Sequence, residues 1–398
     1  MTKPAFLCFR GLAAPVDLGG ATDLADLARA VCPGWPIEVT STTDTPAFFK
    51  ALPDGDRYLV GPPGGPMKRV DALNAVCDIV AALPDDRGFL SRALLCLHTA
   101  AVSMGDGLVL FPNTKKAGKS TLAVALADAG HAVFTDDYLR VIRAGDGTAL
   151  GVANGVLPRL RLPVPQALGD RAGPQALGDR AGPRNRQYLY AEVSALPAEG
   201  QTEALRALVF LDRNEGAAAT LTEVTADEAM RAMLYQNFGR HLHSGTTLAA
   251  MAPIVEGLPR FRLTYDDPTD AAALLEARMP DLPATVARLP DALDQTILDD
   301  LPDSEPRWRV GTPARQVRDV ARRDIGEGVY LADPEGRAIE RLDPLAAVIW
   351  DMLEDGAAAP EITRLLGDAF PDTPPGTIAD DVDRLLRKLA RAGLIETP

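Results

Sequence analysis

The run Phe111–Gly130, FPNTKKAGKSTLAVALADAG, constrains the fold of this chain more than any other segment. A loop that binds phosphate needs a curled backbone, a lysine for the outer phosphates and a hydroxyl for Mg²⁺, and the pattern G-x-x-x-x-G-K-[ST] supplies them. Gly118, Lys119 and Ser120 form its second half. Asn113 stands where the first glycine belongs, and asparagine accepts positive φ more readily than most residues. The loop can therefore close, and the run predicts nucleotide binding.

The segments on both sides of the loop favour the same interpretation. Leu108–Phe111 is typical of a buried strand, and a helical face follows the loop, formed by Leu122, Ala125, Leu126 and Ala129. Strand, loop and helix in this order aim a helix N-terminus at a bound anion. The residues predicted to bind the nucleotide are Asn113, Thr114, Lys115, Lys116, Ala117, Gly118, Lys119, Ser120 and Thr121.

Asp136 and Asp137 follow a short apolar strand beyond that helix. A carboxylate at a strand end beside such a loop holds Mg²⁺, and a second carboxylate can accept a proton from an attacking hydroxyl. The pair favours a kinase over a passive nucleotide sensor, with an ordinary solvated Asp-Asp turn as the alternative. We expect ATP and Mg²⁺ as cofactors, with Ser120, Asp136 and Asp137 as metal ligands.

Composition limits the class of protein that carries this loop. A chain of 398 residues with 46% hydrophobic and 24% charged residues is ordinary for a globular protein of two or three domains. No apolar stretch reaches the about 20 residues that span a bilayer, and the amino terminus is a poor secretion signal. A net charge of −14 disfavours general nucleic-acid binding. We expect a cytoplasmic protein without membrane or nucleic-acid partners, and leave a homo-oligomer open.

Other polar residues are candidates for chemistry. The cysteines contain no C-x-x-C pair and predict buried thiols: Cys8, Cys32, Cys77 and Cys96. His241 and His243 alternate as metal ligands do, without a third ligand in view. Two arginine pairs could clamp phosphate or an acidic substrate, or could be surface charges: Arg159 with Arg161, and Arg184 with Arg186.

Composition also divides the chain into four parts. Residues 1–87 predict a small α/β unit with a helix near Val70–Leu83, and residues 88–297 predict an α/β core. Residues 298–313 are acidic and proline-rich, which is typical of a linker. Within the core, Pro165–Gly182 holds two copies of PQALGDRAG, which indicates a duplication in a surface loop or a mobile lid.

Residues 314–398 predict a hairpin followed by three helices. The hairpin turns at Asp333-Pro334-Glu335-Gly336. Thr377 and Asp380 are placed to cap the third helix. The three apolar stripes are Leu345, Val348, Ile349 and Met352; Ile362, Leu365, Leu366 and Ala369; and Ile378, Val382, Leu385, Leu386 and Leu389. These elements predict a winged-helix-like module.

The region Gly88–Arg143 resembles the HPr kinase/phosphorylase family. That family has a histidine fifteen positions before the first loop glycine, and His98 stands fifteen positions before Asn113. Its G-H and D-D pairs are matched by Gly130-His131 and Asp136-Asp137, and Leu208–Gly216 looks like a later core strand ending at Arg213.

The resemblance implies a fold and a set of residue roles. The fold is an α/β P-loop kinase core of the HPr kinase and phosphoenolpyruvate carboxykinase type. Lys119 would bind the β- and γ-phosphates and Ser120 would bind Mg²⁺. Asp136 and Asp137 would divide the metal and base roles in an order left open, with His98 beside the base. The signature of the family's phosphorylase half has no counterpart, so neither the reverse reaction nor HPr as substrate is implied.

The last part resembles PqqD-like domains, which bind leader peptides of ribosomally made, post-translationally modified peptides. The hairpin, RLDPLAAVIWDMLEDG, EITRLLGDAF and DVDRLLRKLARAGLI carry the resemblance. In that family the peptide adds as a strand to the hairpin sheet and lies against the last helix. The alternative is a dimerisation or DNA-binding module; the acidity of the chain disfavours DNA, although basic residues crowd the last helix, namely Arg384, Arg387, Lys388 and Arg391.

Together these features predict an ATP-dependent phosphotransferase with an alcohol group as acceptor. The core would phosphorylate a Ser/Thr-type hydroxyl of a precursor peptide captured by the carboxy-terminal domain. Two alternatives stay open: a kinase of a small-molecule hydroxyl, and a non-catalytic, ATP-gated peptide chaperone or adaptor.

Overall fold

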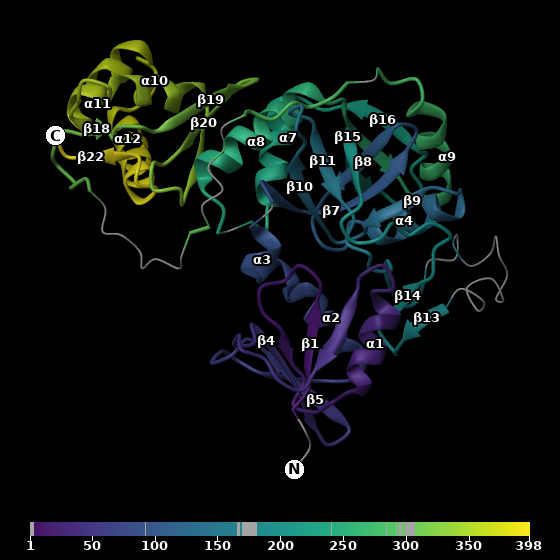
Figure 1. Cartoon of the computed structure of the whole chain (residues 1–398). Helices are drawn as coiled ribbons and strands as arrows, with labels where there is room; N and C mark the ends of the chain where they lie inside the picture. The colour runs from purple at the N-terminus through teal and green to yellow at the C-terminus, as the bar shows by residue number, and fades with distance from the viewer. Residues whose placement is uncertain are drawn as a thin grey trace. The chain divides into compact units, whose positions relative to one another are not determined.

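The computed structural model describes residues 4–398 except 92, 165–167, 169–180, 240, 284, 292, 294–296 and 299–306. Most of the duplicated segment Pro165–Gly182 and half of the predicted linker therefore lie outside the described residues. The chain forms two compact units (Figure 1). The first comprises Met1–Val224, Arg231–Gly239 and Gly257–Leu289, and the second comprises Thr225–Met230, Arg240–Glu256 and Pro290–Pro398. The predicted boundaries of the four sequence parts stay predictions.

The first unit begins with a six-stranded sheet in the order β3-β1-β2-β4-β5-β6. Its strands are β1 (Phe6–Phe9), β2 (Val16–Asp17), β3 (Ile37–Thr40), β4 (Phe49–Asp54), β5 (Arg57–Gly61) and β6 (Lys68–Val70). The helices are α1 (Asp23–Val31), α2 (Ala72–Ala82), the short 3₁₀ turn η1 (Leu83–Asp85) and α3 (Arg87–Leu90). Helix α2 begins where the Asp71 carboxylate accepts a hydrogen bond from the Asn74 N–H at 2.9 Å.

An eight-stranded sheet follows, in the order β11-β10-β7-β8-β15-β17-β16 with β9 beside β7. Its strands are β7 (Leu95–Met104), β8 (Gly107–Pro112), β9 (Ala132–Thr135), β10 (Tyr138–Arg143), β11 (Ala149–Val152), β15 (Thr202–Arg213), β16 (Thr220–Glu223) and β17 (Arg260–Tyr265). Because β8, β15 and β17 run parallel, their carboxyl ends meet at one edge of the sheet. The loop after β8 therefore lies beside the ends of β15 and β17.

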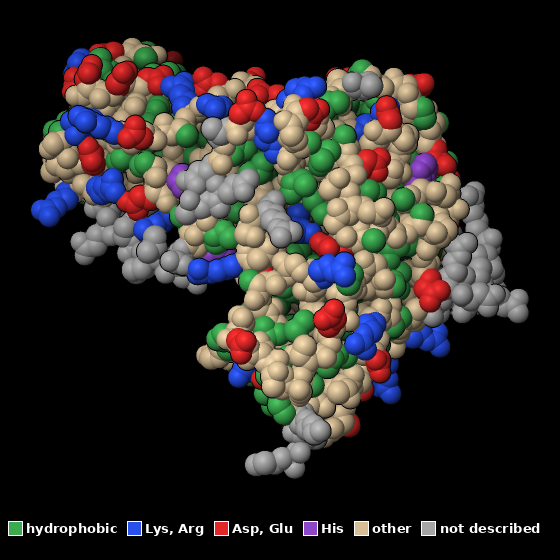
Figure 2. All heavy atoms as spheres, viewed as in Figure 1, with side chains coloured by type: hydrophobic (Ala, Val, Ile, Leu, Met, Phe, Trp, Pro, Cys, Tyr) green, Lys and Arg blue, Asp and Glu red, His purple; other side chains and the backbone are tan. Residues whose placement is uncertain are grey.

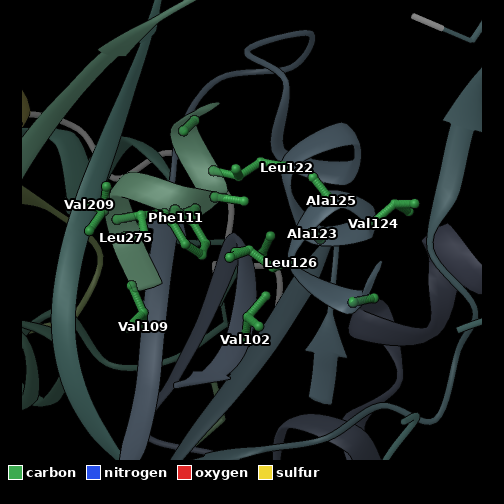
Figure 3. Packing of buried hydrophobic residues seen from close by; sticks show 14 of the residues in the cluster. Val102, Val109, Phe111, Leu122, Ala123, Val124, Ala125, Leu126, Val209 and Leu275 are labelled. Carbon is green, nitrogen blue, oxygen red and sulfur yellow. The ribbon is translucent and has the colours of Figure 1, made fainter. Parts of the chain in front are cut away.

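Helices and a small sheet complete this part of the chain. They are α4 (Lys119–Asp128), α9 (Pro268–Arg278) and a three-stranded sheet of β12 (Arg159–Arg161), β14 (Tyr188–Ala191) and β13 (Ala181–Arg184). Helix α7 (Ala226–Tyr235) is divided between the two units, and α8 (Ser244–Gly257) belongs almost entirely to the second. Figure 3 shows Leu122 and Leu126 of α4 in one buried cluster with Phe111 of β8, Val209 of β15 and Leu275 of α9. The predicted mixed α/β fold is confirmed.

Three residues of the face predicted for the helix after the loop are buried, namely Leu122, Ala125 and Leu126, whereas Ala129 is exposed. Burial extends beyond that face, because residues 122–127 are all buried. Helix α4 packs against α9 as well as against β7 and β9, so it has no solvated face along most of its length.

The carboxy-terminal part of the second unit, residues 314–398, contains a hairpin sheet and three helices. Its strands are β18 (Arg315–Gln316), which pairs with β22 (Ile395–Glu396), and β19 (Ala321–Ile325), β20 (Gly328–Ala332) and β21 (Ile339–Leu342), which form one antiparallel sheet. Its helices are α10 (Pro344–Met352), α11 (Ala359–Ala369) and α12 (Pro375–Arg391). The turn lies where predicted, because the Asp333 carboxylate accepts hydrogen bonds from the N–H groups of Arg337 at 2.7 Å and Ala338 at 2.6 Å.

Several details predicted for these helices are wrong. In the second stripe Leu365 and Ala369 are exposed. In the first stripe Leu345 is 44% and Val348 53% exposed, while Ala347 and Trp350 are buried. Burying the larger indole removes more apolar area from water than burying valine would, which turns α10 accordingly. Neither Thr377 nor Asp380 caps α12, which begins at Pro375, a residue that fits the first turn because its missing N–H would have no helical partner there.

Two observations concern the linker and the winged-helix expectation. Trp308 of the predicted linker is buried in the core of the second unit. The winged-helix arrangement of that unit stays a prediction. Among the described residues, no helix is both long enough and apolar enough to cross a bilayer.

Candidate active site

A pocket of about 590 Å³ in the first unit brings most of the predicted site residues together. It is lined by seven loop and helix residues, Lys115 to Thr121, and by His98, Asp136 and Asp137. Asn113 and Thr114 do not line it and lie at the base of the loop between β8 and α4. Three arginines add positive charge to the pocket wall: Arg159, Arg161 and Arg213.

The loop between β8 and α4 closes differently from the way its sequence predicts. Positive φ occurs at Lys116 (71°) and Gly118 (98°), not at Asn113. Asn113 acts through its side chain, because its amide donates to the Leu211 carbonyl at 2.5 Å and its Oδ1 accepts from the Thr114 N–H at 2.8 Å. The asparagine thus fastens the start of the loop to β15.

Lys119 lies inside the curl of this loop. Its Nζ donates to the carbonyls of Asn113 at 2.6 Å and Thr114 at 3.0 Å. Burial lowers the pKa of Lys119 to about 8, although the nearby charges of Asp137 and Asp136 act in the opposite direction. The ammonium group is therefore held beside the place where a helix N-terminus would receive phosphate.

Asp136 forms the connection between β9 and β10 and is only 7% exposed. Its Oδ2 accepts a hydrogen bond from the Arg159 N–H at 2.9 Å, and its carboxylate is also bonded to the Ser120 hydroxyl. Burial and the charge of Asp137 together raise the pKa of Asp136 despite these bonds. The buried Asp136 and the half-buried Ser120 therefore form one oxygen pair at the start of α4.

Asp137 has a different environment. Its Oδ1 lies 3.3 Å from Nε2 of His98, and about a third of its side chain is exposed (34%). Burial acts to raise the pKa of Asp137, but the His98 hydrogen bond and the charges of Arg159 and Lys119 outweigh it, so the pKa is lowered. Two adjacent carboxyl groups with pKa values moved in opposite directions are typical of divided acid–base roles.

His98 is positioned by two residues that sequence reasoning missed. Its Nδ1 lies 2.8 Å from Oε1 of Gln236, and its ring stacks on Phe238 with 5.0 Å between centroids. Both follow α7, far from His98 in the sequence. Their residue types form no recognisable motif, and no signal in the sequence could have found them.

The donor set of the pocket fits Mg²⁺. Mg²⁺ is held in phosphotransfer sites by one or two carboxylates together with phosphates and waters. Ser120, Asp136 and Asp137 offer a hydroxyl and two carboxylates in one pocket. Within the described ranges, no group of three or more His, Cys, Asp or Glu side chains could hold a metal ion. A hydroxyl and two carboxylates are the kinds of protein ligand that hold Mg²⁺ when it also binds phosphate.

The remaining candidates lie elsewhere. His241 and His243 do not line the pocket, and Nδ1 of His243 accepts a hydrogen bond from the Gly245 N–H at 3.1 Å. The predicted thiols are all free, with Cys8 half-buried and the others buried. Arg184 and Arg186 line a different pocket of the first unit.

Comparison with known proteins characterises the second unit. Residues 328–395 match the family model described as "Coenzyme PQQ synthesis protein D (PqqD)". The segment runs from β20 through α12 to Ile395, so the predicted resemblance of the carboxy-terminal part to PqqD is confirmed. No curated protein matches the chain.

The chain is also similar to a solved structure titled "Structure of the Hpr(Ser) kinase/phosphatase from Coxiella burnetii". The identity is 12%, and the alignment covers 47% of this chain and 94% of that chain, with a TM-score of 0.24.

Proposed function

We propose that the protein is an ATP-dependent kinase that phosphorylates a Ser/Thr-type hydroxyl of a ribosomally made precursor peptide. One observation carries the proposal: a single pocket joins Lys119 and Ser120 to Asp136, Asp137 and His98. A protein that only senses a nucleotide needs the loop. It does not need a carboxylate held ionised beside a buried imidazole, which is the arrangement of a general base.

The environments of the two carboxylates divide their roles. Asp137 has the lowered pKa and the accessible oxygen, so it is the base that accepts the proton of the substrate hydroxyl. Asp136 is buried and bonded to Ser120, so these two residues would hold Mg²⁺. The sequence left open which aspartate has which role. The differences in burial and in hydrogen-bond partners support Asp137 as the base and Asp136 as the metal ligand.

The reaction would then be an in-line displacement at the γ-phosphorus. The substrate oxygen forms the new P–O bond while its proton passes to Asp137, and the bond to the ADP oxygen breaks. Lys119 and the pocket arginines face the charge that develops on the transferred group. Bound Mg²⁺ would neutralise the β- and γ-phosphate oxygens.

The second unit supplies a means of peptide capture. Among the described residues β21 pairs with β20 alone, which leaves its other edge free to accept a strand. Strand addition gives affinity through backbone hydrogen bonds. Together with the PqqD match, this free edge supports a peptide as the acceptor.

Incubation with γ-labelled ATP, Mg²⁺ and desalted lysate of the native host tests the proposal. Wild-type protein is compared with Lys119→Ala, Asp137→Asn and Glu215→Gln, the last being an exposed carboxylate outside the pocket. We expect a labelled peptide with wild type and Glu215→Gln only. A labelled small molecule would indicate the small-molecule kinase, and label that is absent or independent of Lys119 would contradict a kinase altogether.

A further inference from the structure

A second pocket of the first unit, about 1250 Å³ in volume, is lined by four arginines. They are Arg57 of β5, Arg69 of β6, Arg184 at the end of β13, and Arg186 in the turn that follows. We call this second pocket the arginine pocket. Leu162 lines both this pocket and the pocket of Asp137. Acidic residues outnumber basic ones in the chain, 55 to 41, and Figure 2 shows both signs scattered over the visible face. A gathering of arginines therefore runs against the overall charge.

The turn that carries Arg186 is held in place by its neighbours. Oδ1 of Asn185 accepts hydrogen bonds from the N–H groups of Gln187 and Tyr188, both at 2.8 Å. The Asn185 amide donates to both carboxylate oxygens of Asp71, at 3.1 and 3.2 Å. The turn is thus fixed to the start of α2, and the two flanking arginines are presented from a defined backbone.

Asp71, the acidic residue that lines the arginine pocket, already has hydrogen-bond partners for its carboxylate. The Asp71 carboxylate accepts from the N–H and the side-chain amide of Asn74, each at 2.9 Å, in addition to its bonds from Asn185. Arg69 is paired with Asp54 at 2.6 Å and with Asp56 at 3.2 Å. No described residue forms an ion pair or hydrogen bond with the exposed guanidinium groups of Arg57, Arg184 or Arg186, so three positive charges stay available to a ligand.

The arginine pocket continues toward the catalytic residues through the small sheet. Strand β14 lies between β12 and β13, so Arg161 and Arg184 stand on opposite sides of it. The guanidinium groups of Arg159 and Arg161 lie 5.0 and 5.5 Å from the centre of the Tyr188 ring on β14. A row of arginines thus leads from the pocket of Asp137 to the arginine pocket.

We propose that the arginine pocket binds an acidic segment of the acceptor peptide, adjacent to the hydroxyl that is phosphorylated. The inference rests on the proposed function and specifies that the acceptor peptide is acidic near the phosphorylated residue. Guanidinium groups recognise carboxylates with paired hydrogen bonds. Each exposed pair is weak and sensitive to salt, so recognition depends on several carboxylates in one segment.

The composition of the arginine pocket favours a peptide over single-stranded nucleic acid. Sites for single strands stack bases on aromatic rings. The described lining of the arginine pocket contains no aromatic side chain, and its apolar members are aliphatic, namely Leu27, Val70, Ala72, Leu73, Leu162 and Pro183. Aliphatic groups between arginines suit a polypeptide whose carboxylates alternate with apolar stems.

Fluorescence anisotropy with two labelled peptides on the full chain tests the proposal. The probes are EEESEEE and QQQSQQQ, which differ in charge but not in length. At low salt we expect the acidic probe to bind about ten-fold tighter, which is the scale of a few exposed ion pairs. Arg184→Glu/Arg186→Glu should remove this preference. The control Arg10→Glu/Arg278→Glu makes the same change in net charge at exposed sites outside the arginine pocket and should retain it.

Several outcomes would overturn the assignment: equal affinity for the two probes, the same loss in both double variants, or tighter binding of an oligothymidylate than of EEESEEE. A second readout separates it from the kinase itself. If Arg184→Glu/Arg186→Glu lost the preference for the acidic probe but labelled the precursor at the wild-type rate, the kinase would stand and the arginine pocket would have no part in substrate recognition. If the charge preference depended on Arg184 and Arg186 but no phosphoproduct formed, the arginine pocket would stand and the kinase would be contradicted.

Discussion

Nε2 of the His98 imidazole lies 3.3 Å from Oδ1 of Asp137, while Nδ1 of the same ring lies 2.8 Å from Oε1 of Gln236. A side-chain amide oxygen only accepts hydrogen bonds, so Gln236 fixes a proton on Nδ1. Nε2 faces the carboxylate and donates the hydrogen bond to Asp137. In the proposed reaction this bond orients the carboxylate that takes the proton of the substrate hydroxyl.

Replacing Gln236 should therefore impair turnover more than nucleotide binding. Gln236→Leu leaves Nδ1 buried without an acceptor, and we expect kcat to fall about ten-fold or more, on the scale of one mispositioned acid–base group. Gln236→Glu restores an acceptor and should recover most of the activity. Steady-state kinetics give the comparison, with KM for ATP near the wild-type value in both variants. Equal kcat in both would mean that Gln236 does not position His98.

Substitutions of Asp136 and Asp137 should impair the reaction in different ways. Asp137→Asn removes the base and should lower kcat by about 10²–10⁴-fold at any Mg²⁺ concentration. Asp136→Asn weakens the oxygen pair with Ser120 and should raise the Mg²⁺ concentration needed for half-maximal rate. Titration of Mg²⁺ in both variants separates the effects. If the two variants gave the same Mg²⁺ dependence, the division of roles proposed from their burial would be wrong.

The lowered pKa of Lys119 predicts an unusual pH dependence of kcat/KM for ATP. Its pKa is lowered to about 8 chiefly by burial, so the side chain loses its proton, and its attraction for phosphate, as pH rises through about 8. Because kcat/KM reports ionisations of the free enzyme, kcat/KM for ATP should decline above that pH. Lys119→Arg keeps its charge and should not show the decline. A wild-type profile that stays flat above pH 8, or one that Lys119→Arg reproduces, would contradict this role.

The lowered pKa of Lys119 also makes the free energy of unfolding depend on pH. The unfolded chain holds the Lys119 proton up to the ordinary lysine pKa of 10.5, whereas the folded chain releases it from about 8. The unfolded state therefore binds more protons between these values, and the contribution of Lys119 to the free energy of unfolding rises with pH across this window. Comparison of wild type with Lys119→Met by urea unfolding across the window measures it.

The loop could be predicted from its motif and the acid pair from its place at the end of a strand, whereas His98 was predicted through the resemblance to the HPr kinase/phosphorylase family; all three lie between β7 and β10. Gln236 reaches His98 only through tertiary packing, which residue spacing along one segment does not record. The face of α10 was predicted wrongly for a related reason. Periodicity marks apolar positions, but the choice between Val348 and Trp350 depends on the shape of the partner surface.

Asn113 illustrates the difference between a residue type and its use. The motif suggested a backbone role, whereas the structure gives the side chain two hydrogen bonds and places positive φ at Lys116 and Gly118. Asn113→Gly restores the usual motif but should destabilise the protein by about 1–3 kcal/mol, because the Leu211 carbonyl and the Thr114 N–H lose their partner. Urea unfolding measures this. A variant as stable as wild type, with unchanged ATP affinity, would support the backbone interpretation instead.

Gly118 and Tyr265 form the tightest steric constraint on the loop. A Cβ added at Gly118 would lie 2.5 Å from the Tyr265 hydroxyl, and the glycine has φ of 98°. That hydroxyl is buried and has no hydrogen-bond partner among the described residues. Gly118→Ala should therefore weaken both folding and ATP binding, through the clash and through a backbone conformation that costs roughly 1 kcal/mol for alanine.

A double-mutant cycle separates the two causes. Tyr265→Phe removes an unpaired buried hydroxyl and should leave stability unchanged or slightly higher. Combined with Gly118→Ala, it removes the clashing atom but not the strained φ, so we expect partial recovery with a coupling energy of about 1–2 kcal/mol by urea unfolding. Additive effects of the two substitutions would show that the loop shifts away from Tyr265 at little cost. Full recovery would show that the clash alone, and not the backbone, requires glycine at this position.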